Sequence, residues 1–250
     1  MARQIGPLKF LGTIGDLTFY KSQDGYLIKQ KSDIPKSRID TDPNYARTRE
    51  NNREFTRATK ACQLIYSTTR ELIANAFDNR LMGRMTKKAI EIIKSDTVNP
   101  RGERTISDGQ FDLFNGFEFN IHASLSAVIN IPITHSINRT TGEMQVIIPP
   151  FVPVEHIRSP MEATHYRLVA IGAAFDFPNL SKVAVKADTD HLPLSGTETD
   201  PISLTCTLPA NSLLPLFLLL GIEFSQEVNS THYQLKNGCH NALAILQLNA

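Results

Sequence analysis

The stretch "ISLTCTL", residues 202–208, decides the fold class because apolar and polar side chains alternate along it. Successive side chains of a strand point to opposite faces, so a period of two predicts a strand with one buried face. Such alternation is typical of antiparallel sheets. We expect the inner faces of the domain to include the following side chains: Ile202, Leu204, Cys206, Leu208, Tyr166 and Leu168.

Other strands are predicted on both sides of this stretch. "THSINRTTGEMQVIIP", residues 134–149, indicates a hairpin around Thr141-Gly142, and "LFLLLGIEFSQEV", residues 216–228, indicates a long strand. Roughly eight or nine such strands, separated by Pro, Gly and Asn turns within about 135 residues, match an antiparallel Ig-like β-sandwich. The prediction places this sandwich domain at residues 111–250.

A helical region is predicted before the sandwich. Asp42 followed by Pro43 is typical of a helix start, and an apolar stripe begins only at Phe55. Thr68 to Glu71 reads as a capping box that opens a second helix, and a third helix is expected to end near Asp96. The polar segment "VNPRGERTISDG", residues 98–109, then predicts a linker and a domain boundary. Residues 1–110 are therefore expected to form a separate region.

The chain begins with a predicted β-hairpin, "GTIGDLTFYKSQDGYLIKQK", residues 12–31. Asp24-Gly25 favours a turn, and a loop at this point places Phe19 opposite Ile28 and Tyr20 opposite Leu27. The complete prediction is an α+β chain: an N-terminal hairpin and helices, then the sandwich.

The two hairpin pairs lie on opposite faces of the ribbon, so both faces carry apolar groups. A lone two-stranded ribbon is marginal in water and needs a further strand or layer. It can pack on its own helices, join the later sheet, or complete a neighbouring subunit. We take Phe19, Tyr20, Leu27 and Ile28 as candidate subunit-interface residues.

Charge is divided unevenly along a chain whose net charge is only +1. Residues 1–110 carry 20 Lys and Arg against 13 Asp and Glu, whereas residues 111–250 carry 6 against 12. A basic front and an acidic back suit nucleic acid at one end or head-to-tail contact between copies of the chain.

A row of arginines on the first helix adds further candidate interface residues. Arg49, Arg53 and Arg57 are spaced to lie on one helix face. The row fits a solvated face, contact with an acidic protein surface, or phosphates of nucleic acid. No aromatic side chains are interleaved with it for stacking on bases.

Composition is that of an ordinary globular protein, with 41% hydrophobic and 20% charged residues. The apolar run "LLPLFLLLGI", residues 213–222, is too short for a membrane span, so we expect none. The first residues do not resemble a signal peptide, so synthesis in the cytoplasm is expected, with the final location open. Three widely spaced cysteines suit a reducing compartment.

No motif in the sequence indicates a chemistry. Walker A, GxGxxG, GxSxG, HExxH and CxxC patterns are all missing from it, and the histidines are scattered singly. The acidic segment at residues 188–200 lacks the spacing of a calcium loop and favours a solvated loop. We therefore predict no catalytic residue, no metal ligand and no cofactor.

Three segments together resemble an uncharacterised family of Bacteroidota proteins: the hairpin at residues 12–31, "RIDTDPNYARTRENNREF" and "DGQFDLFNGFEFN". Members share a G-x-I-G-x-x-x-F-Y-K hairpin, a helix containing T-R-E-N and a β-sandwich-like C-terminal half. The resemblance implies a bacterial or phage-related origin and the two-part layout, and it brings no catalytic residues.

These features predict a non-enzymatic structural subunit that assembles with other copies of itself into a filament, tube or phage-like particle. The alternative is a binding module, for nucleic acid through the basic helix or for carbohydrate through the sandwich. A role as an enzyme ranks third.

Overall fold

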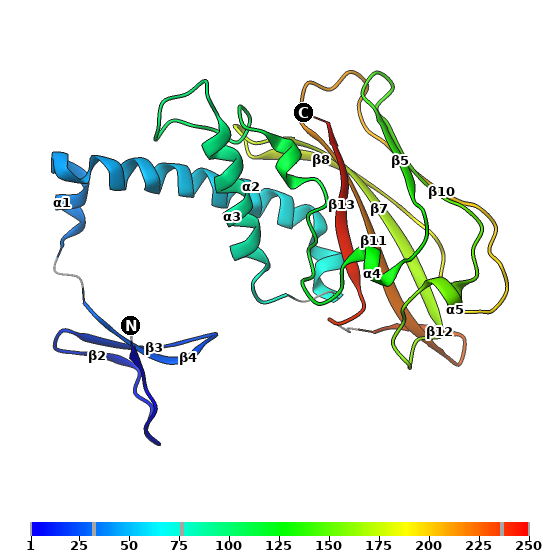
Figure 1. Cartoon of the computed structure of the whole chain (residues 1–250), viewed down its shortest axis with the longest axis horizontal. Helices are drawn as coiled ribbons and strands as arrows, with labels where there is room; N and C mark the ends of the chain where they lie inside the picture. Colours follow the sequence, from blue (N-terminus) through cyan, green and yellow to red (C-terminus); the bar gives the residue numbers. More distant parts are fainter. Residues whose placement is uncertain (1, 32–33, 76–77, 236–237, 250) are drawn as a thin grey trace. The chain divides into compact units, whose positions relative to one another are not determined.

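The computed structural model describes residues 2–31, 34–75, 78–235 and 238–249. The chain divides into two compact units, Met1–Asn51 and Asn52–Ala250, here called the N-terminal unit and the C-terminal unit. This division lies well before the boundary that the sequence predicts at residues 110/111. Figure 1 shows the elements of both units along the chain.

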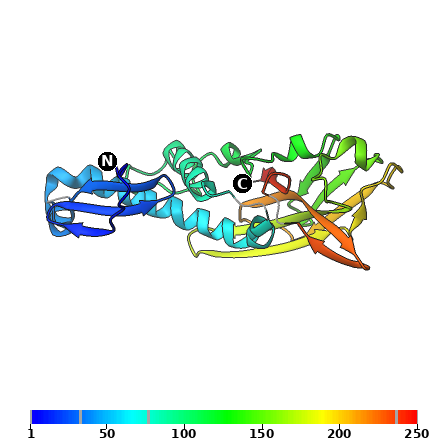
Figure 2. The same cartoon turned by 90° about the horizontal axis from the view of Figure 1, so that it is seen from below.

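The N-terminal unit contains a four-stranded antiparallel sheet in the order β1-β4-β3-β2 (Figure 2). Its strands are β1 (Ala2–Arg3), β2 (Gly12–Ile14), β3 (Leu17–Ser22) and β4 (Gly25–Gln30). The hairpin has the predicted register, with Phe19 opposite Ile28 and Tyr20 opposite Leu27.

Both neighbours of this hairpin come from its own chain. β1 pairs with β4 and β2 pairs with β3. Neither edge of the hairpin itself is therefore open to a strand from another copy. The contributions left for a partner are a strand beyond β1 or β2 and a second layer over the sheet.

The N-terminal unit has no core of its own. None of its described residues is buried. A sheet becomes independently stable when an apolar face is covered, and here each apolar side chain retains solvent contact.

Short helical turns lead into a long helix. α1 (Lys36–Thr41) precedes the 3₁₀ turn η1 (Pro43–Tyr45), and α2 (Ala46–Asn75) follows. The carboxylate of Asp42 accepts a hydrogen bond from the Asn44 backbone N–H at 2.9 Å, so the predicted cap at this helix entry is confirmed.

The predicted break in the helix at Thr68 is wrong, because α2 continues to Asn75. The hydroxyls of Thr68 and Thr69 donate to the carbonyls of Leu64 and Ile65, one turn earlier, each at 3.3 Å. Threonine can bond back to the preceding turn and so remain inside a helix.

The described part of the C-terminal unit holds two antiparallel sheets. The six-stranded sheet has the order β12-β11-β7-β8, with β13 also pairing β11 and β9 also pairing β7. Its strands are β7 (His165–Asp176), β8 (Ser181–Asp188), β9 (Leu192–Pro193), β11 (Leu216–Val228), β12 (Thr231–Gln234) and β13 (Ala242–Asn249).

The second sheet is three-stranded, in the order β10-β6-β5. Its strands are β5 (Thr134–Asn138), β6 (Glu143–Ile148) and β10 (Ile202–Thr207). The remaining helical elements of the unit are α3 (Leu81–Ser95), η2 (Phe111–Phe114), α4 (Leu125–Val128) and α5 (Pro153–His156).

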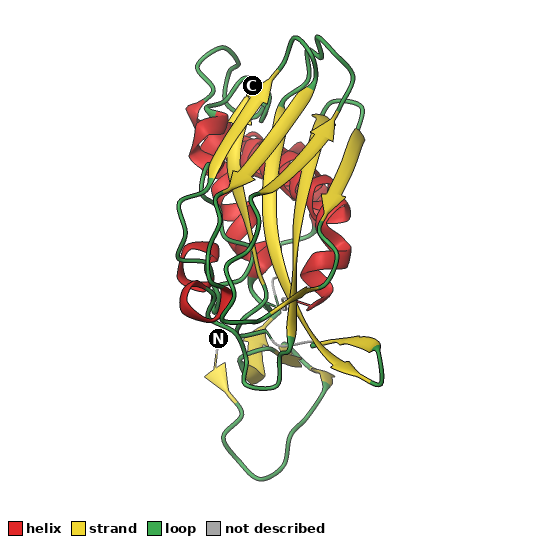
Figure 3. Cartoon of the chain, turned by 90° about the vertical axis from the view of Figure 1, so that its right-hand side faces the viewer, coloured by secondary structure: helices red, strands yellow, loops and turns green. Residues whose placement is uncertain are grey.

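The central strands of the six-stranded sheet are covered on both faces. Helices pack on one face, where Ala61 and Ile92 share a core with Phe217; Figure 3 shows α2 and α3 behind the strands. The three-stranded sheet packs on the other face, where Met144 and Cys206 share a core with Leu218. β7 and β11 are consequently buried along most of their length.

This layering explains why the sequence-based boundary is misplaced. Most of α2 and all of α3 belong to the same core as the sheet, although they precede residue 110. The fold contains both helices and many antiparallel strands, as predicted, and the larger sheet is curled. Leu204, Cys206, Leu208, Tyr166 and Leu168 are buried as expected, and Ile202 is partly buried.

The predicted linker at residues 98–109 is held firmly to the C-terminal unit by Asp96. Its buried carboxylate accepts four hydrogen bonds of 2.8–3.0 Å from Val98, Asn99 and Thr105. Burial raises the pKa of Asp96, but these bonds outweigh it and lower the pKa to about 2. Within the described ranges, no helix is both long enough and apolar enough to cross a membrane.

Candidate functional sites

The register of the N-terminal sheet places one set of apolar side chains on the same face. Directly paired residues share a face, and residues two positions apart along a strand do so as well. Phe19 pairs with Ile28, Leu17 pairs with Ile14, and Tyr26 pairs with Lys21. We define the apolar sheet face as the apolar residues of this set: Ile14, Leu17, Phe19, Tyr26 and Ile28. Lys21 and Gln30 lie on the same face.

This apolar sheet face is open to solvent. Ile14 is 65% exposed and Leu17 is 44% exposed, while the other three are partly exposed. Phe10, itself exposed, packs its ring edge-on against Phe19 at a centroid distance of 5.8 Å. Monomeric proteins rarely expose large contiguous apolar patches, and those that occur mark interaction sites.

The opposite face of the same sheet is more polar. It holds the second predicted pair, Tyr20 with Leu27, together with Lys29. The ammonium of Lys29 lies over the Tyr20 ring, 5.7 Å from its centroid. Both faces therefore carry apolar side chains, as predicted, and the face with Tyr20 and Leu27 is the more polar of the two.

Of the three predicted interface arginines, two contact backbone carbonyls of their own chain. Arg49 donates to the carbonyls of Ile39 and Asp42 at 2.7 and 2.9 Å. Arg57 donates to those of Gly102 and Arg104 at 2.9 and 3.0 Å. Arg53 is exposed, and it is the member of the row that the structure leaves on the surface.

The acidic residues beside the arginines also have partners within the chain. Glu50 pairs with Arg47 at 2.8 Å. Glu54 is buried, and its carboxylate accepts the Gly102 N–H at 2.7 Å. Arg57 and Glu54 together fix the loop at residues 102–104 on α2.

An open apolar groove lies between α2 and α3 within the C-terminal unit. It has a volume of about 550 Å³. Phe55, Met82 and Ile90 provide its apolar lining, and Lys87 and Lys94 lie at its rim. The Phe55 side chain is 53% exposed, so the apolar stripe predicted on this helix begins outside the core.

A cluster of imidazole and carboxylate side chains forms at one end of the six-stranded sheet. His165 is the first residue of β7 and pairs with Ser225 of β11. Two positions further along β11, Glu227 pairs with His232 of β12. The register therefore places His165, Glu227 and His232 on one face of the sheet.

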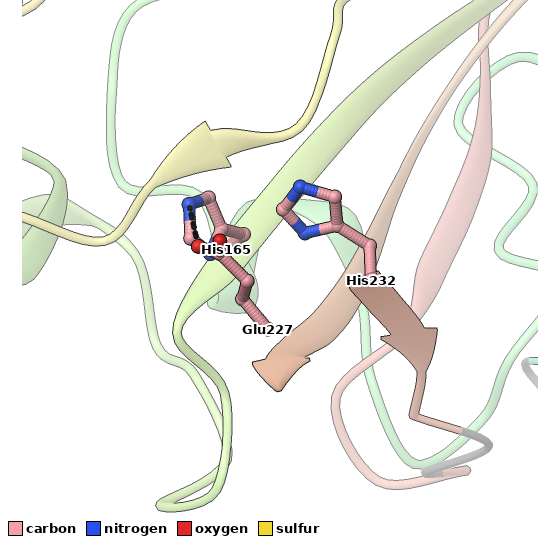
Figure 4. A group of neighbouring side chains, drawn as sticks. All are labelled: His165, Glu227 and His232. Atoms are coloured by element: carbon pink, nitrogen blue, oxygen red, sulfur yellow. Dashed lines mark ion pairs between the residues drawn. The ribbon is translucent and has the colours of Figure 1, made fainter. Parts of the chain in front are cut away.

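The three side chains converge, as Figure 4 shows. One nitrogen or oxygen from each lies within 4.8 Å of those of the other two. The His165 Nε2 is 3.5 Å from a Glu227 carboxylate oxygen, and the His165 and His232 ring centroids are 4.7 Å apart.

A third histidine extends this cluster. The ring of His191 stacks on that of His232 with a centroid distance of 4.2 Å and an interplanar angle of 4°. Its Nδ1 lies 2.8 Å from the Ser225 hydroxyl. Burial, followed by the charge of His232, lowers the pKa of His191.

Residues of the acidic segment 188–200 belong to two different groups of contacts. His191 joins the histidines, whereas Asp188 pairs with Lys186 at 3.1 Å and with Arg167 at 3.7 Å. Arg167 also pairs with Glu223 at 2.5 Å. The carboxylate of Asp188, at the end of β8, is matched by cations of its own sheet.

Sequence reasoning missed the histidine cluster because its members are far apart along the chain. One local signal was present. In "EVNSTH", residues 227–232, Asn229 and Ser230 both adopt positive φ, at 52° and 60°. A two-residue turn of this kind closes a hairpin and places Glu227 opposite His232. The sequence alone does not place His165 beside these two residues, because its position depends on how β7 pairs with β11.

The chain matches no family model, no curated protein and no solved structure. The resemblance to the Bacteroidota family therefore stays a prediction, and the geometry of the two units carries the functional argument.

Proposed function

We propose that this chain is a non-enzymatic structural subunit that self-assembles into a homopolymer. The observation that carries the proposal is the apolar sheet face, which lies in a unit whose described residues include none that are buried. A second layer contributed by another copy completes the missing core.

The energy available from covering this face is large enough for assembly. Burying one large apolar side chain fully contributes about 1.5–3 kcal/mol. The apolar sheet face and Phe10 together offer several such side chains, part of whose area is already covered. Sheet layers pack face to face through side chains of this kind.

The α2–α3 groove is the surface that we propose receives this face on the next copy. It is open, mostly apolar and lined in part by the exposed Phe55. A contact between two different patches leaves one of each free at the ends of the assembly, so growth continues as a ring or filament. A contact of the sheet face with itself would close after two copies.

The uneven charge of the chain favours association between copies in general. The basic excess lies in residues 1–110 and the acidic excess in residues 111–250. Both proposed contact surfaces lie in the basic part, so burial of apolar side chains, and not charge, carries the contact between them. Two arginines of the row are bound to carbonyls of the chain, which weakens the nucleic-acid alternative. We also propose that residues 111–250 form the predicted Ig-like sandwich. Such a domain suits a subunit with a structural role.

Two point variants test the heterologous contact. Phe19→Asp places a charge on the apolar sheet face, and Phe55→Asp places one in the groove. Each variant alone is expected to remain monomeric at concentrations where the unmodified chain polymerises, measured by analytical ultracentrifugation. Mixed together, each still has one intact surface, so they are expected to form a 1:1 dimer that does not grow.

A matched control is Val98→Asp, since Val98 is exposed and lies in neither surface; it should polymerise normally. If Phe55→Asp polymerises normally, the groove is not the receiving surface. If the unmodified chain stays monomeric up to high concentration, the proposal of a homopolymer is wrong.

A further inference from the structure

We propose that His165, Glu227 and His232 bind a divalent transition-metal ion, with zinc as the first expectation. The inference concerns the C-terminal unit alone and does not depend on assembly. It starts from the convergence of two imidazoles and one carboxylate on a single sheet face.

The donor set selects the class of ion. Calcium and magnesium are hard ions that take oxygen ligands throughout. Imidazole nitrogen suits zinc, copper, iron and nickel, and two histidines with one carboxylate is a recurring set for such ions. Since no cysteine of the chain is among these ligands, a thiolate site of the zinc-finger type does not apply.

The spacing of the donors requires only a small closure. Bonds of about 2.0–2.1 Å at tetrahedral angles place ligand atoms roughly 3.4 Å apart. The His165 Nε2 and the Glu227 carboxylate oxygen are already 3.5 Å apart. The third donor, from His232, lies within 4.8 Å of both, and closing the site requires the exposed His232 ring to shift from its stack on His191.

The Thr164 hydroxyl positions two of the three ligand residues through hydrogen bonds. Its hydroxyl oxygen lies 2.9 Å from the Nδ1 of His165 and accepts the Glu227 backbone N–H at 2.7 Å. With Nδ1–H donating to this hydroxyl, the Nε2 of His165 keeps the lone pair that a metal needs. Hydrogen bonds of this kind orient metal-ligating histidines and raise their basicity.

The surroundings also suit a cation. Arg167 is a fixed positive charge two residues beyond His165 on β7, and Glu223 pairs with it at 2.5 Å. The carboxylate of Glu227 therefore supplies net negative charge at the cluster. Three protein ligands leave one tetrahedral position for water or another exchangeable ligand.

Calorimetric titration of the dialysed full-length chain with Zn²⁺ tests this site. One ion per chain is expected for the unmodified protein. His232→Ala should abolish saturable binding. Thr164→Val, which keeps all three ligands, should weaken it by about 10–100-fold. His135→Ala is the matched control, because His135 is exposed on β5 away from the cluster, and its titration should be unchanged.

A second probe and a second variant distinguish a loss of metal binding from misfolding of a variant. Co²⁺ in the same site should give the visible absorption of a four-coordinate ion, and Glu227→Gln, which keeps the shape of the side chain, should reduce it. Phe19→Asp should bind Zn²⁺ normally, since assembly and metal binding are separate. The inference is overturned if the unmodified chain shows no saturable Zn²⁺ binding, or if His232→Ala and Glu227→Gln bind it as well as the unmodified chain does.

Discussion

The two units of this chain contain sheets of opposite character. The six-stranded sheet has its central strands covered on both faces, and Phe217 of β11 is fully buried among the rings of Phe111, Phe175 and Phe177. The N-terminal sheet has a face with Phe19 and Tyr26 on which every described side chain stays at least partly exposed. A sheet therefore acquires a buried core only when a second layer covers its apolar face, and strand pairing alone does not provide one.

We expect the largest difference in stability between the two sheets when one aromatic ring is removed from each. Phe217→Ala should lower the free energy of unfolding by about 3–5 kcal/mol, because it leaves a cavity in a packed core. Phe19→Ala should lower it by less than about 1 kcal/mol in dilute, unassembled protein. Urea denaturation followed by circular dichroism measures both. A loss of several kcal/mol for Phe19→Ala would show that the N-terminal sheet already has a hidden core.

A buried polar residue gives a second comparison between the two units, with an intermediate loss of unfolding free energy. Asp96→Ala leaves the donors of Val98, Asn99 and Thr105 unpaired and should cost about 1–3 kcal/mol. Asp40 is exposed in the N-terminal unit, and Asp40→Ala is the control, expected to change stability little. Equal effects of the two substitutions would contradict the anchoring role given to Asp96.

The same carboxylate predicts an acid dependence. The pKa of Asp96 is about 2 in the folded chain and about 3.9 in an unfolded one. Since the folded pKa is the lower one, the stabilisation is complete above pH 3.9 and disappears as the pH falls through 2. Asp96→Asn should show a flatter loss of unfolding free energy across this interval, measured by urea titrations at each pH.

The smallest expected effect lies in the centre of the C-terminal unit. The Tyr166 hydroxyl is buried and has no hydrogen-bond partner among the described residues, and burial raises its pKa to about 12. Tyr166→Phe removes an unpaired polar group, so stability should stay constant or rise by up to about 1 kcal/mol. A clear loss of stability would mean that an ordered water satisfies the hydroxyl.

What the sequence predicted well were the features set by neighbouring residues. The register of Phe19 with Ile28 follows from a short turn, and the burial of Cys206 follows from alternation along one strand. Continuity of α2 through Thr68 did not follow, because a capping box and a back-bonding threonine have the same sequence pattern.

The features that escaped prediction depend on contacts between distant segments. The boundary near residue 110 was misplaced because a polar linker and a loop pinned by Asp96 look alike without their partners. The cluster of His165, Glu227 and His232 joins β7 with the β11–β12 hairpin, and the pairing of His165 with Ser225 brings them together. Arg57 looked free because the carbonyls it contacts lie far along the chain.

The order of the two units along the chain has a consequence during synthesis. The strands of the N-terminal sheet all lie before residue 31, and a hairpin forms within about 1–10 μs of leaving the ribosome. β13, which completes the larger sheet, follows roughly 200 residues later, about 10–40 s at 5–20 residues per second. On every nascent chain, the surface proposed to join two subunits is therefore displayed before the domain that it connects has been made.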